Sequence, residues 1–426
     1  MTMLLKNAEV FTPEGFKPRD LFISDGKVFV LAADSSETTD AVRIIDCTGK
    51  VIVPGFTDVH VHLREPGFFY KESIATGTAA AARGGYTCVC SMPNVKPVPS
   101  TVDALRAQLD IIEKDAKVKT VPYGTITMEQ DGRSSLSDME AMAPYVCAFS
   151  DDGKGVQTAQ LMEEAMIRAK RTGKLIVAHC EDESLLHGGY IHDGAYARAH
   201  GHRGICSKSE WIQVQRDTEL SEKTGAGYHV CHISTKESVE ILRKAKERGA
   251  DVSGETAPHY LILCEDDLQE DGRFKMNPPL RSAEDRDALI EGIKDGSIDM
   301  IATDHAPHSA EEKAKGLAGS AFGIVGLETA FSVLYTCLVK KGVITLEKLI
   351  ELMSVNPRKR FGLEGGLIAD GQPADLTVLD LNRSYRIDPA RFASKGRATP
   401  FEGWEVQGKV LITMVNGEIA YEETDA

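Results

Sequence analysis

Two histidines lie one residue apart in a short apolar stretch, where they could bind a metal ion. In Asp58-Val59-His60-Val61-His62 the residue types alternate, so a strand would project His60 and His62 from one face. Two imidazoles on one pleat can bind one divalent ion, although a polar strand face with two hydrogen-bonded histidines would give the same pattern. Asp58 lies on that face too and could orient one of the ligands.

Three further ligand-type side chains, His179, His232 and Asp304, each close an apolar run. A single buried histidine at a strand end is more often structural than ligating. Three such side chains beside a His-x-His are hard to explain as structural, because each buried polar group without a partner costs about 1–3 kcal/mol. Four histidines with one or two aspartates suit Zn²⁺ or a similar divalent ion. The neighbouring Cys180 and Cys231 alternate to the opposite strand face, so we expect them in the core.

The elements that must position these side chains alternate through the middle of the chain. Apolar, strand-like runs occur at Phe56–His62, Thr87–Met92, Thr120–Thr125, Val146–Ser150, Leu175–Cys180, Tyr228–Ile233, Asp251–Thr256 and Asp299–Asp304. Helical patterns between them include Glu72–Arg83, Val102–Lys117, Ala159–Thr172, Lys236–Arg248 and Glu284–Lys294. Eight strands alternating with helices over about 250 residues predict a (β/α)8 barrel, and an open doubly wound sheet is the alternative. The barrel is favoured because the ligand-type residues follow strand ends, where such a barrel builds its site.

Both ends of the chain differ from this middle, because they show short strands and turns. We therefore predict a smaller β-sandwich domain built from residues 1–52 and 362–426, flanking a barrel of residues 53–361. The fold class predicted is α/β.

Composition narrows the class of protein. The chain has 426 residues and a formal net charge of -15, which argues against nucleic acid as a partner. We find no signal peptide and no apolar run near the roughly 20 residues that span a bilayer, so no membrane partner is expected. Nine cysteines are scattered through apolar runs, typical of buried thiols in a reducing cytoplasm.

The motifs together resemble those of the cyclic amidohydrolases, and within them the class I bacterial dihydroorotases. The resemblance is carried, through essentially the whole chain, by residues 54–67, Met92-Pro93-Asn94, residues 149–153, Ala178-His179-Cys180-Glu181, residues 229–235, residues 275–281 and residues 302–308. It implies two zinc ions per chain, the first held by His60, His62 and Asp304 and the second by His179 and His232, with Asp152 bridging them. Relatives such as hydantoinases and allantoinases bridge with a carboxylated lysine, whereas this strand end offers Asp151-Asp152 and no lysine before Lys154. Which of the two aspartates bridges stays open.

The resemblance also implies a set of substrate-binding residues. They are His62, Arg64, Asn94, Asn277 and His308, with the backbone of Phe322-Gly323 hydrogen-bonding the ring. Arg64 can bind a carboxylate through two donors, although a surface ion pair is its plain alternative. Two departures from the family pattern are Val95, where threonine is commoner, and Ala321, where proline is commoner. Because alanine is less rigid than proline, we expect the loop at Ala321 to be looser.

The activity implied is the reversible hydrolysis of (S)-dihydroorotate to N-carbamoyl-L-aspartate, a step of pyrimidine (UMP) synthesis. Water held between two zinc ions would be deprotonated near neutral pH, and Asp304 would pass its proton to the leaving nitrogen as general base and acid. One alternative is a hydantoinase- or allantoinase-type cyclic amidase. Another is a non-catalytic relative that assembles with aspartate transcarbamoylase, which the filled ligand positions disfavour. A small-molecule substrate and a homodimer are expected.

Overall fold

The structure is a computed structural model that describes residues 2–33 and 43–424. Its strands are β1 (Met3–Thr12), β2 (Gly15–Ser24), β3 (Lys27–Ala32), β4 (Arg43–Asp46), β5 (Val51–Pro54), β6 (Phe56–Val61), β7 (Tyr86–Ser91), β8 (Lys119–Pro122), β9 (Ile176–Ala178), β10 (Ile191–His192), β11 (Gly204–Ile205), β12 (Tyr228–Val230), β13 (Val252–Thr256), β14 (Met300–Ile301), β15 (Leu376–Arg386), β16 (Glu405–Val415) and β17 (Glu418–Glu422). Its α-helices are α1 (Ile74–Arg83), α2 (Val102–Asp115), α3 (Met139–Met142), α4 (Ala159–Thr172), α5 (Ala195–His200), α6 (Lys208–Thr224), α7 (Lys236–Glu247), α8 (Pro258–Ile262), α9 (Ala283–Asp295), α10 (Ala310–Lys313), α11 (Gly316–Gly319), α12 (Ala330–Leu334), α13 (Leu346–Ile350) and α14 (Asn356–Phe361).

The central strands are parallel and form two sheets, in the orders β6-β7-β8 and β14-β13-β12-β9. Single bridges join the sheets at both edges. On one side Phe149 pairs with Gly124 and Ile176, and on the other Val61 pairs with His305. The alternation of parallel strands and helices expected from the sequence is confirmed.

The stretch Val146–Ser150, expected as a strand, forms no extended ladder. Its backbone nevertheless bonds to both neighbours. On one side Cys147 N donates to Pro122 O at 3.0 Å and Ser150 N to Gly124 O at 2.9 Å, and on the other Phe149 N donates to Leu175 O at 3.1 Å. The segment therefore occupies a strand position and pairs on both sides, through isolated bridges at Phe149.

Apolar side chains fill the space that the parallel strands enclose. One buried cluster takes members from most of them, including Val59 of β6, Cys90 of β7, Val177 of β9 and Met300 of β14. Tyr123 lies in the same cluster and donates its hydroxyl to the carbonyl of Val59 at 2.7 Å. The strands consequently surround a packed core, and a binding site can lie only at their ends.

The helices expected from the sequence are present, and the ends of several follow from capping. Thr101, Thr158, Thr235 and Ser282 accept a backbone N–H at the start of α2, α4, α7 and α9, and Gly173 ends α4 in a left-handed conformation. Helix α6, at 17 residues, is not among the helical patterns that the sequence shows. Its buried face is mostly polar and has no apolar stripe.

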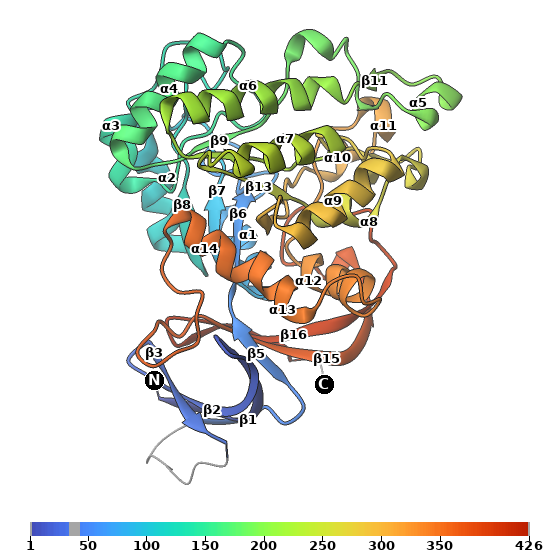
Figure 1. Cartoon of the computed structure of the whole chain (residues 1–426). Coiled ribbons are helices and arrows are strands. Elements are labelled where there is room, and N and C mark those ends of the chain that lie inside the picture. Colours follow the sequence, from blue (N-terminus) through green and yellow to red (C-terminus); the bar gives the residue numbers. More distant parts are fainter. Residues whose placement is uncertain (1, 34–42, 425–426) are drawn as a thin grey trace.

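Strands from both chain ends form one eight-stranded sheet, in the order β17-β16-β15-β5-β1-β2-β3 with β4 beside β1. Figure 1 shows these strands gathered at one end of the molecule, away from the long helices α4, α6 and α7. The sheet has its own apolar cluster, which includes Leu5, Ile23, Leu376 and Met414. Fully buried Arg358 links the two parts, donating to Thr57 and Thr87 of the central strands and to Asp375 before β15.

Two expectations about the chain as a whole can be compared with the structure. All nine cysteines are free thiols, and seven of them are buried. In the part of the chain described, no helix has the length and apolar character needed to cross a membrane.

Candidate metal centre

The candidate ligands that follow the central strands lie around one cavity of about 210 Å³. Its lining residues are His62, Arg64, Asn94, Asp152, Gly153, His179, His232, Asn277, Asp304, Ala306, His308, Phe322 and Gly323. His60 lies beneath the cavity and is fully buried. The structure thus brings together every candidate site residue, from segments up to 263 positions apart, counted from His60 to Gly323.

The His-x-His pair faces two carboxylates. His62 Nε2 lies 3.2 Å from Asp304 Oδ1 and 3.4 Å from Asp152 Oδ2. His60 Nε2 lies 3.3 Å from Asp152 Oδ1 and 3.5 Å from Asp304 Oδ1. His60, His62 and Asp304 offer ligand atoms within 4.8 Å of one another, a spacing that fits one metal ion.

A second group of donors lies beside the first. His179 Nδ1 and His232 Nε2 are 2.9 Å apart, and Asp152 Oδ1 is 3.7 Å from the former and 3.5 Å from the latter. These three residues form another set with ligand atoms within 4.8 Å. Asp152 therefore contacts both groups.

The atoms in these two groups lack the partners that burial requires. His60 Nδ1 lies 2.7 Å from Glu255 Oε1, and because a carboxylate only accepts, this nitrogen carries the hydrogen. In the neutral ring, the form that binds a metal, the lone pair of His60 Nε2 points toward carboxylate oxygens, and neither this atom nor Asp152 Oδ1 has a hydrogen-bond partner. A cation between these donors satisfies both, so the residues fit a divalent metal ion.

The electrostatics lead to the same conclusion. Burial acts to lower the pKa of His60, but Asp152 and the other nearby carboxylates raise it well above its ordinary value. Burial acts to raise the pKa of Asp152, but the imidazoles, His60 foremost, hold it well below its usual range. Burial also acts to raise the pKa of Asp304, but the imidazoles of His60 and His62 lower it to about 2. The carboxylates stay ionised, and their negative field favours a bound cation.

Backbone conformation is unusual at three of these positions. Arg64, His232 and Asp304 have φ values of 59°, 31° and 48°, in the left-handed region that non-glycine residues rarely adopt. Such backbone strain is concentrated at functional sites, where the surrounding structure holds it. The core position expected for Cys231 is confirmed, but the strand face expected for it is not. Cys231 is buried in the core, but its thiol lies within 4.8 Å of donor atoms of His60 and Asp152, because strand alternation stops at the end of β12.

The geometry separates the adjacent aspartates. Asp151 turns away from the donors and accepts hydrogen bonds from Ile126 N at 2.8 Å and from the backbone and hydroxyl of Thr127. Asp152 lies among the imidazoles. Its carbonyl also accepts from Asn94 Nδ2 at 2.8 Å, which ties the donor segment to the rim of the cavity.

Glu255 is a buried residue beside the candidate ligands that no sequence pattern indicated. Its buried carboxylate lies 2.7 Å from His60 Nδ1 and 3.2 Å from His229 Nε2. Burial acts to raise its pKa, but His60 and His229 lower it to about 2. A carboxylate on the other ring nitrogen fixes the tautomer and orientation of a ligating histidine. The available signal was an ionisable residue inside the otherwise apolar and small Val252–Thr256 strand.

We expect Glu255→Gln to weaken metal binding about 10–100-fold, the usual effect of removing such an orienting carboxylate. The amide keeps the shape but loses the charge that fixes the His60 tautomer. Metal content measured after dialysis against graded chelator concentrations tests this. Glu291→Gln, with a side chain 65% exposed, is the matched control and should retain metal as the wild type does.

Two cationic side chains, Arg64 and Lys71, lie close to His308 at the other side of the cavity. Lys71 Nζ lies 3.1 Å from His308 Nδ1 and, since an ammonium only donates, that nitrogen accepts. His308 Nε2 then carries the hydrogen and donates to Phe322 O at 2.7 Å. Burial, then Arg64 and Lys71, lower the pKa of His308 to about 3, so the ring is neutral. The Arg64 guanidinium donates from Nε to Pro307 O at 3.3 Å, and its terminal nitrogens lie 3.5 Å from His62 Nδ1 and 3.4 Å from His308 Nε2. Within residues 2–33 and 43–424, no carboxylate pairs with Arg64, so its charge can be balanced by an anionic ligand.

Two amides and a loop complete the cavity. Asn94 and Asn277 each have a buried side-chain oxygen without a partner, although their amide nitrogens are bonded, that of Asn277 to Glu181 at 2.9 Å. The backbone of Phe322 and Gly323, expected to bind a ring, is already partly occupied. Gly323 N donates to Lys275 O at 3.1 Å, and Phe322 O accepts from His308.

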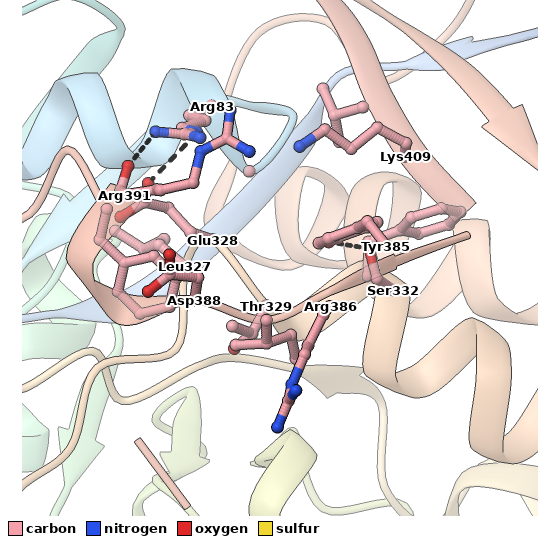
Figure 2. Close-up of a pocket in the computed structure, with 15 residues that line it drawn as sticks. Arg83, Leu327, Glu328, Thr329, Ser332, Tyr385, Arg386, Asp388, Arg391 and Lys409 are labelled. Atoms are coloured by element: carbon pink, nitrogen blue, oxygen red, sulfur yellow. Dashed lines mark hydrogen bonds and ion pairs between the residues drawn. The ribbon is translucent and has the colours of Figure 1, made fainter. Parts of the chain in front are cut away.

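Another hollow, of about 50 Å³, lies between the terminal sheet and the helices (Figure 2). Its polar groups are paired. Arg83 is 3.6 Å from Glu328, Ser332 is 2.7 Å from the hydroxyl of Tyr385, and Lys409 lies over the Tyr385 ring at 4.4 Å. None of the side-chain atoms found buried without a partner in the described ranges belongs to this hollow. We assign it to packing between the two parts of the molecule.

Known proteins resemble this chain along its whole length. The family model described as dihydro-orotase-like matches residues 49–238, and that of the amidohydrolase family matches residues 229–421. Dihydroorotases of Bacillus cereus and Bacillus anthracis are each 49% identical to this chain, with 100% of both sequences covered. The solved structure of an L-hydantoinase (dihydropyrimidinase) from Arthrobacter aurescens is 28% identical, with a TM-score of 0.88 over 100% of this chain and 97% of that one. A dihydropyrimidinase from Brevibacillus agri shares the fold, at 24% identity and a TM-score of 0.85 over 98% and 95%.

The fold and the buried imidazoles and carboxylates define a metal-dependent enzyme of the amidohydrolase class. Its closer affiliation follows from the full-length identity of 49%. The chain belongs to the dihydroorotase family.

Proposed function

We propose that this chain catalyses the reversible hydrolysis of (S)-dihydroorotate to N-carbamoyl-L-aspartate, in the synthesis of pyrimidines. The observation that carries the proposal is the cavity itself. It places the guanidinium of Arg64, which has no carboxylate partner among the described residues, beside two metal-donor groups, so that a ring carboxylate and a scissile amide can be bound together. Full-length similarity to proteins named dihydroorotase supports the same reaction.

We assign the donors to two zinc ions per chain. His60, His62 and Asp304 would hold one ion, His179 and His232 the other, and Asp152 would bridge them. Imidazole and carboxylate are donors suited to zinc, and the contact of Asp152 with both groups supports the bridge. A bridging aspartate is also the basis for placing this chain with the class I bacterial enzymes.

When bound, the metal pair acidifies a water and polarises the amide carbonyl. Asp304 is ionised and lines the cavity, where it can accept a proton and return it to the ring nitrogen as the C–N bond breaks. Arg64 and Asn94 orient the substrate through its carboxylate. The unpartnered oxygen of Asn277 would accept from a ring N–H group. Glu255 holds His60 in the tautomer that ligation needs.

The direct test is hydrolysis of dihydroorotate by the purified full-length protein, with zinc content measured on the same sample. Hydantoin, allantoin and dihydrouracil are compared under the same conditions. The proposal requires dihydroorotate to have the highest kcat/KM. Preference for hydantoin or allantoin would assign the chain to the other cyclic amidases, and absence of turnover on all of them would indicate a non-catalytic relative.

We expect Arg64→Met to lower kcat/KM for dihydroorotate by about ten- to more than a hundredfold. A charge-assisted hydrogen-bonded pair is worth roughly 1.5–3 kcal/mol, and each 1.4 kcal/mol is tenfold. Methionine keeps much of the stem volume but removes the donors. Steady-state kinetics measure the change, and zinc content should not move.

Dihydrouracil, which lacks the ring carboxylate, is the control substrate for this variant. Its slow hydrolysis should hardly change in Arg64→Met. An equal loss for both rings would mean that Arg64 supports the structure rather than the specificity.

The architecture supports two further proposals, one on the barrel and one on the domains. The parallel strands with their bridging segments form a closed (β/α)8 barrel, because paired backbone runs from β6 through β14 and back to β6. Residues 53–361 make this barrel, and residues 1–52 and 362–426 make a β-sandwich domain, which the separate apolar cluster of the terminal sheet supports. We also propose that the enzyme is a cytoplasmic homodimer.

A further inference from the structure

A buried lysine lies behind the loop that lines the cavity. Lys313, the last residue of α10, is 7% exposed, and its ammonium donates three hydrogen bonds. All three acceptors are backbone carbonyls: Lys275 O at 3.0 Å, Ala321 O at 2.8 Å and Gly323 O at 2.6 Å. An ammonium has three donors, so this one is fully used.

The absence of a carboxylate partner makes this arrangement unusual. No acidic side chain of the described residues lies within 4.0 Å of the Lys313 ammonium, and buried charges are ordinarily paired. The charged groups that face it are Lys275, Asp271 and Glu312, and burial, then Lys275, lower its pKa to about 7. The three carbonyl dipoles are therefore what keeps the cation buried, and they are in turn held in place by it.

The acceptors belong to the two segments that carry substrate-binding residues. Lys275 lies two residues before Asn277, and Ala321 and Gly323 flank Phe322. Two further contacts join these segments: a backbone bond from Gly323 N to Lys275 O at 3.1 Å, and the Lys275 ammonium, which lies 4.5 Å from the centroid of the Phe322 ring. Loss of the ammonium of Lys313 would leave the carbonyls of Ala321 and Gly323 unsatisfied, take one of its two donors from Lys275 O, and free the loop to move.

We propose that Lys313 is a positioning residue for substrate binding, which holds the Phe322–Gly323 backbone and the Asn277 segment at a fixed separation. It does not reach the cavity itself. Its role thus rests on the proposed dihydroorotate hydrolysis. A ligand that contacts both segments is bound well only while the ammonium joins them.

The test compares Lys313→Met with wild type in the metal-loaded full-length enzyme. We expect KM for dihydroorotate to rise about tenfold or more, the equivalent of one lost charge-assisted hydrogen bond, while kcat changes less than about threefold. Metal content should stay the same. Amide hydrogen exchange over residues 319–324 should become faster, because the loop opens more often.

Two variants separate positioning from general stability. Lys315→Met makes the same change at an exposed lysine of the same loop and should match wild type in KM and exchange. Lys313→Arg keeps a charge with several donors and should recover part of the loss in KM. If Lys313→Met does not yield folded protein, Lys313→Gln, with fewer donors and no charge, provides the same readings.

A purely structural role would reduce the amount of active enzyme, and so apparent kcat, with KM unchanged. That result, or wild-type KM and exchange in Lys313→Met, would overturn the proposal. If the wild type fails to hydrolyse dihydroorotate, the proposed function is wrong, and the exchange comparison alone then decides whether Lys313 holds the loop.

Discussion

Asp304→Asn is expected to fold and to lose about 10²–10⁴ in kcat, the usual contribution of a positioned general base. Asparagine tolerates the left-handed backbone found at this position, where φ is 48°, so the loop should keep its course. The amide cannot accept a proton as the carboxylate can. The carboxylate also lies 3.2 Å from His62 Nε2, so the change removes one charged metal donor.

Kinetics and metal analysis must be made on the same preparation of this variant. A loss of kcat with metal content near wild type assigns the effect to proton transfer, whereas a parallel loss of metal assigns it to ligation. Asp287→Asn, on an exposed carboxylate with 66% side-chain exposure, is the control. Turnover near that of the wild type in Asp304→Asn would exclude Asp304 as the base.

Removal of metal by chelation should lower activity by about a thousandfold or more, because polarisation of the carbonyl and acidification of water are together worth several kcal/mol. The donor set is too large for one tetrahedral ion, so we expect about two zinc ions per chain. Stability should fall as well, since a ligand that binds only the folded state stabilises it. The thermal midpoint of the metal-free protein is therefore expected below that of the loaded protein.

Titration of zinc into the metal-free protein provides the measurement. Activity should return as about two equivalents are added, and the thermal midpoint should rise with it. Full recovery at one equivalent would support a single catalytic ion. Activity that survives chelation in protein shown to contain no metal would refute the metal centre.

The sequence by itself determined much about this protein, because its signals are local. Alternation in Asp58–His62 puts two imidazoles on one strand face, and apolar runs ending in His179, His232 and Asp304 predict ligands at strand ends. Parallel strands separated by helices align those ends at one edge. The convergence of these side chains at one cavity was within reach of such reasoning, and the family was indicated by the resemblance of the motifs along the chain.

Only the tertiary structure decided which neighbouring groups face each other. Asp151 and Asp152 are adjacent and chemically identical, and hydrogen bonds from Ile126 and Thr127 turn the first one away. Glu255 acts through His60, which lies 195 residues away, and Lys313 acts through carbonyls up to 38 residues away. Pairings between distant segments depend on how the strands and loops pack, and no local pattern records them. A buried charge is stable only where that packing supplies its partner, so the roles of Asp152, Glu255 and Lys313 are properties of the fold.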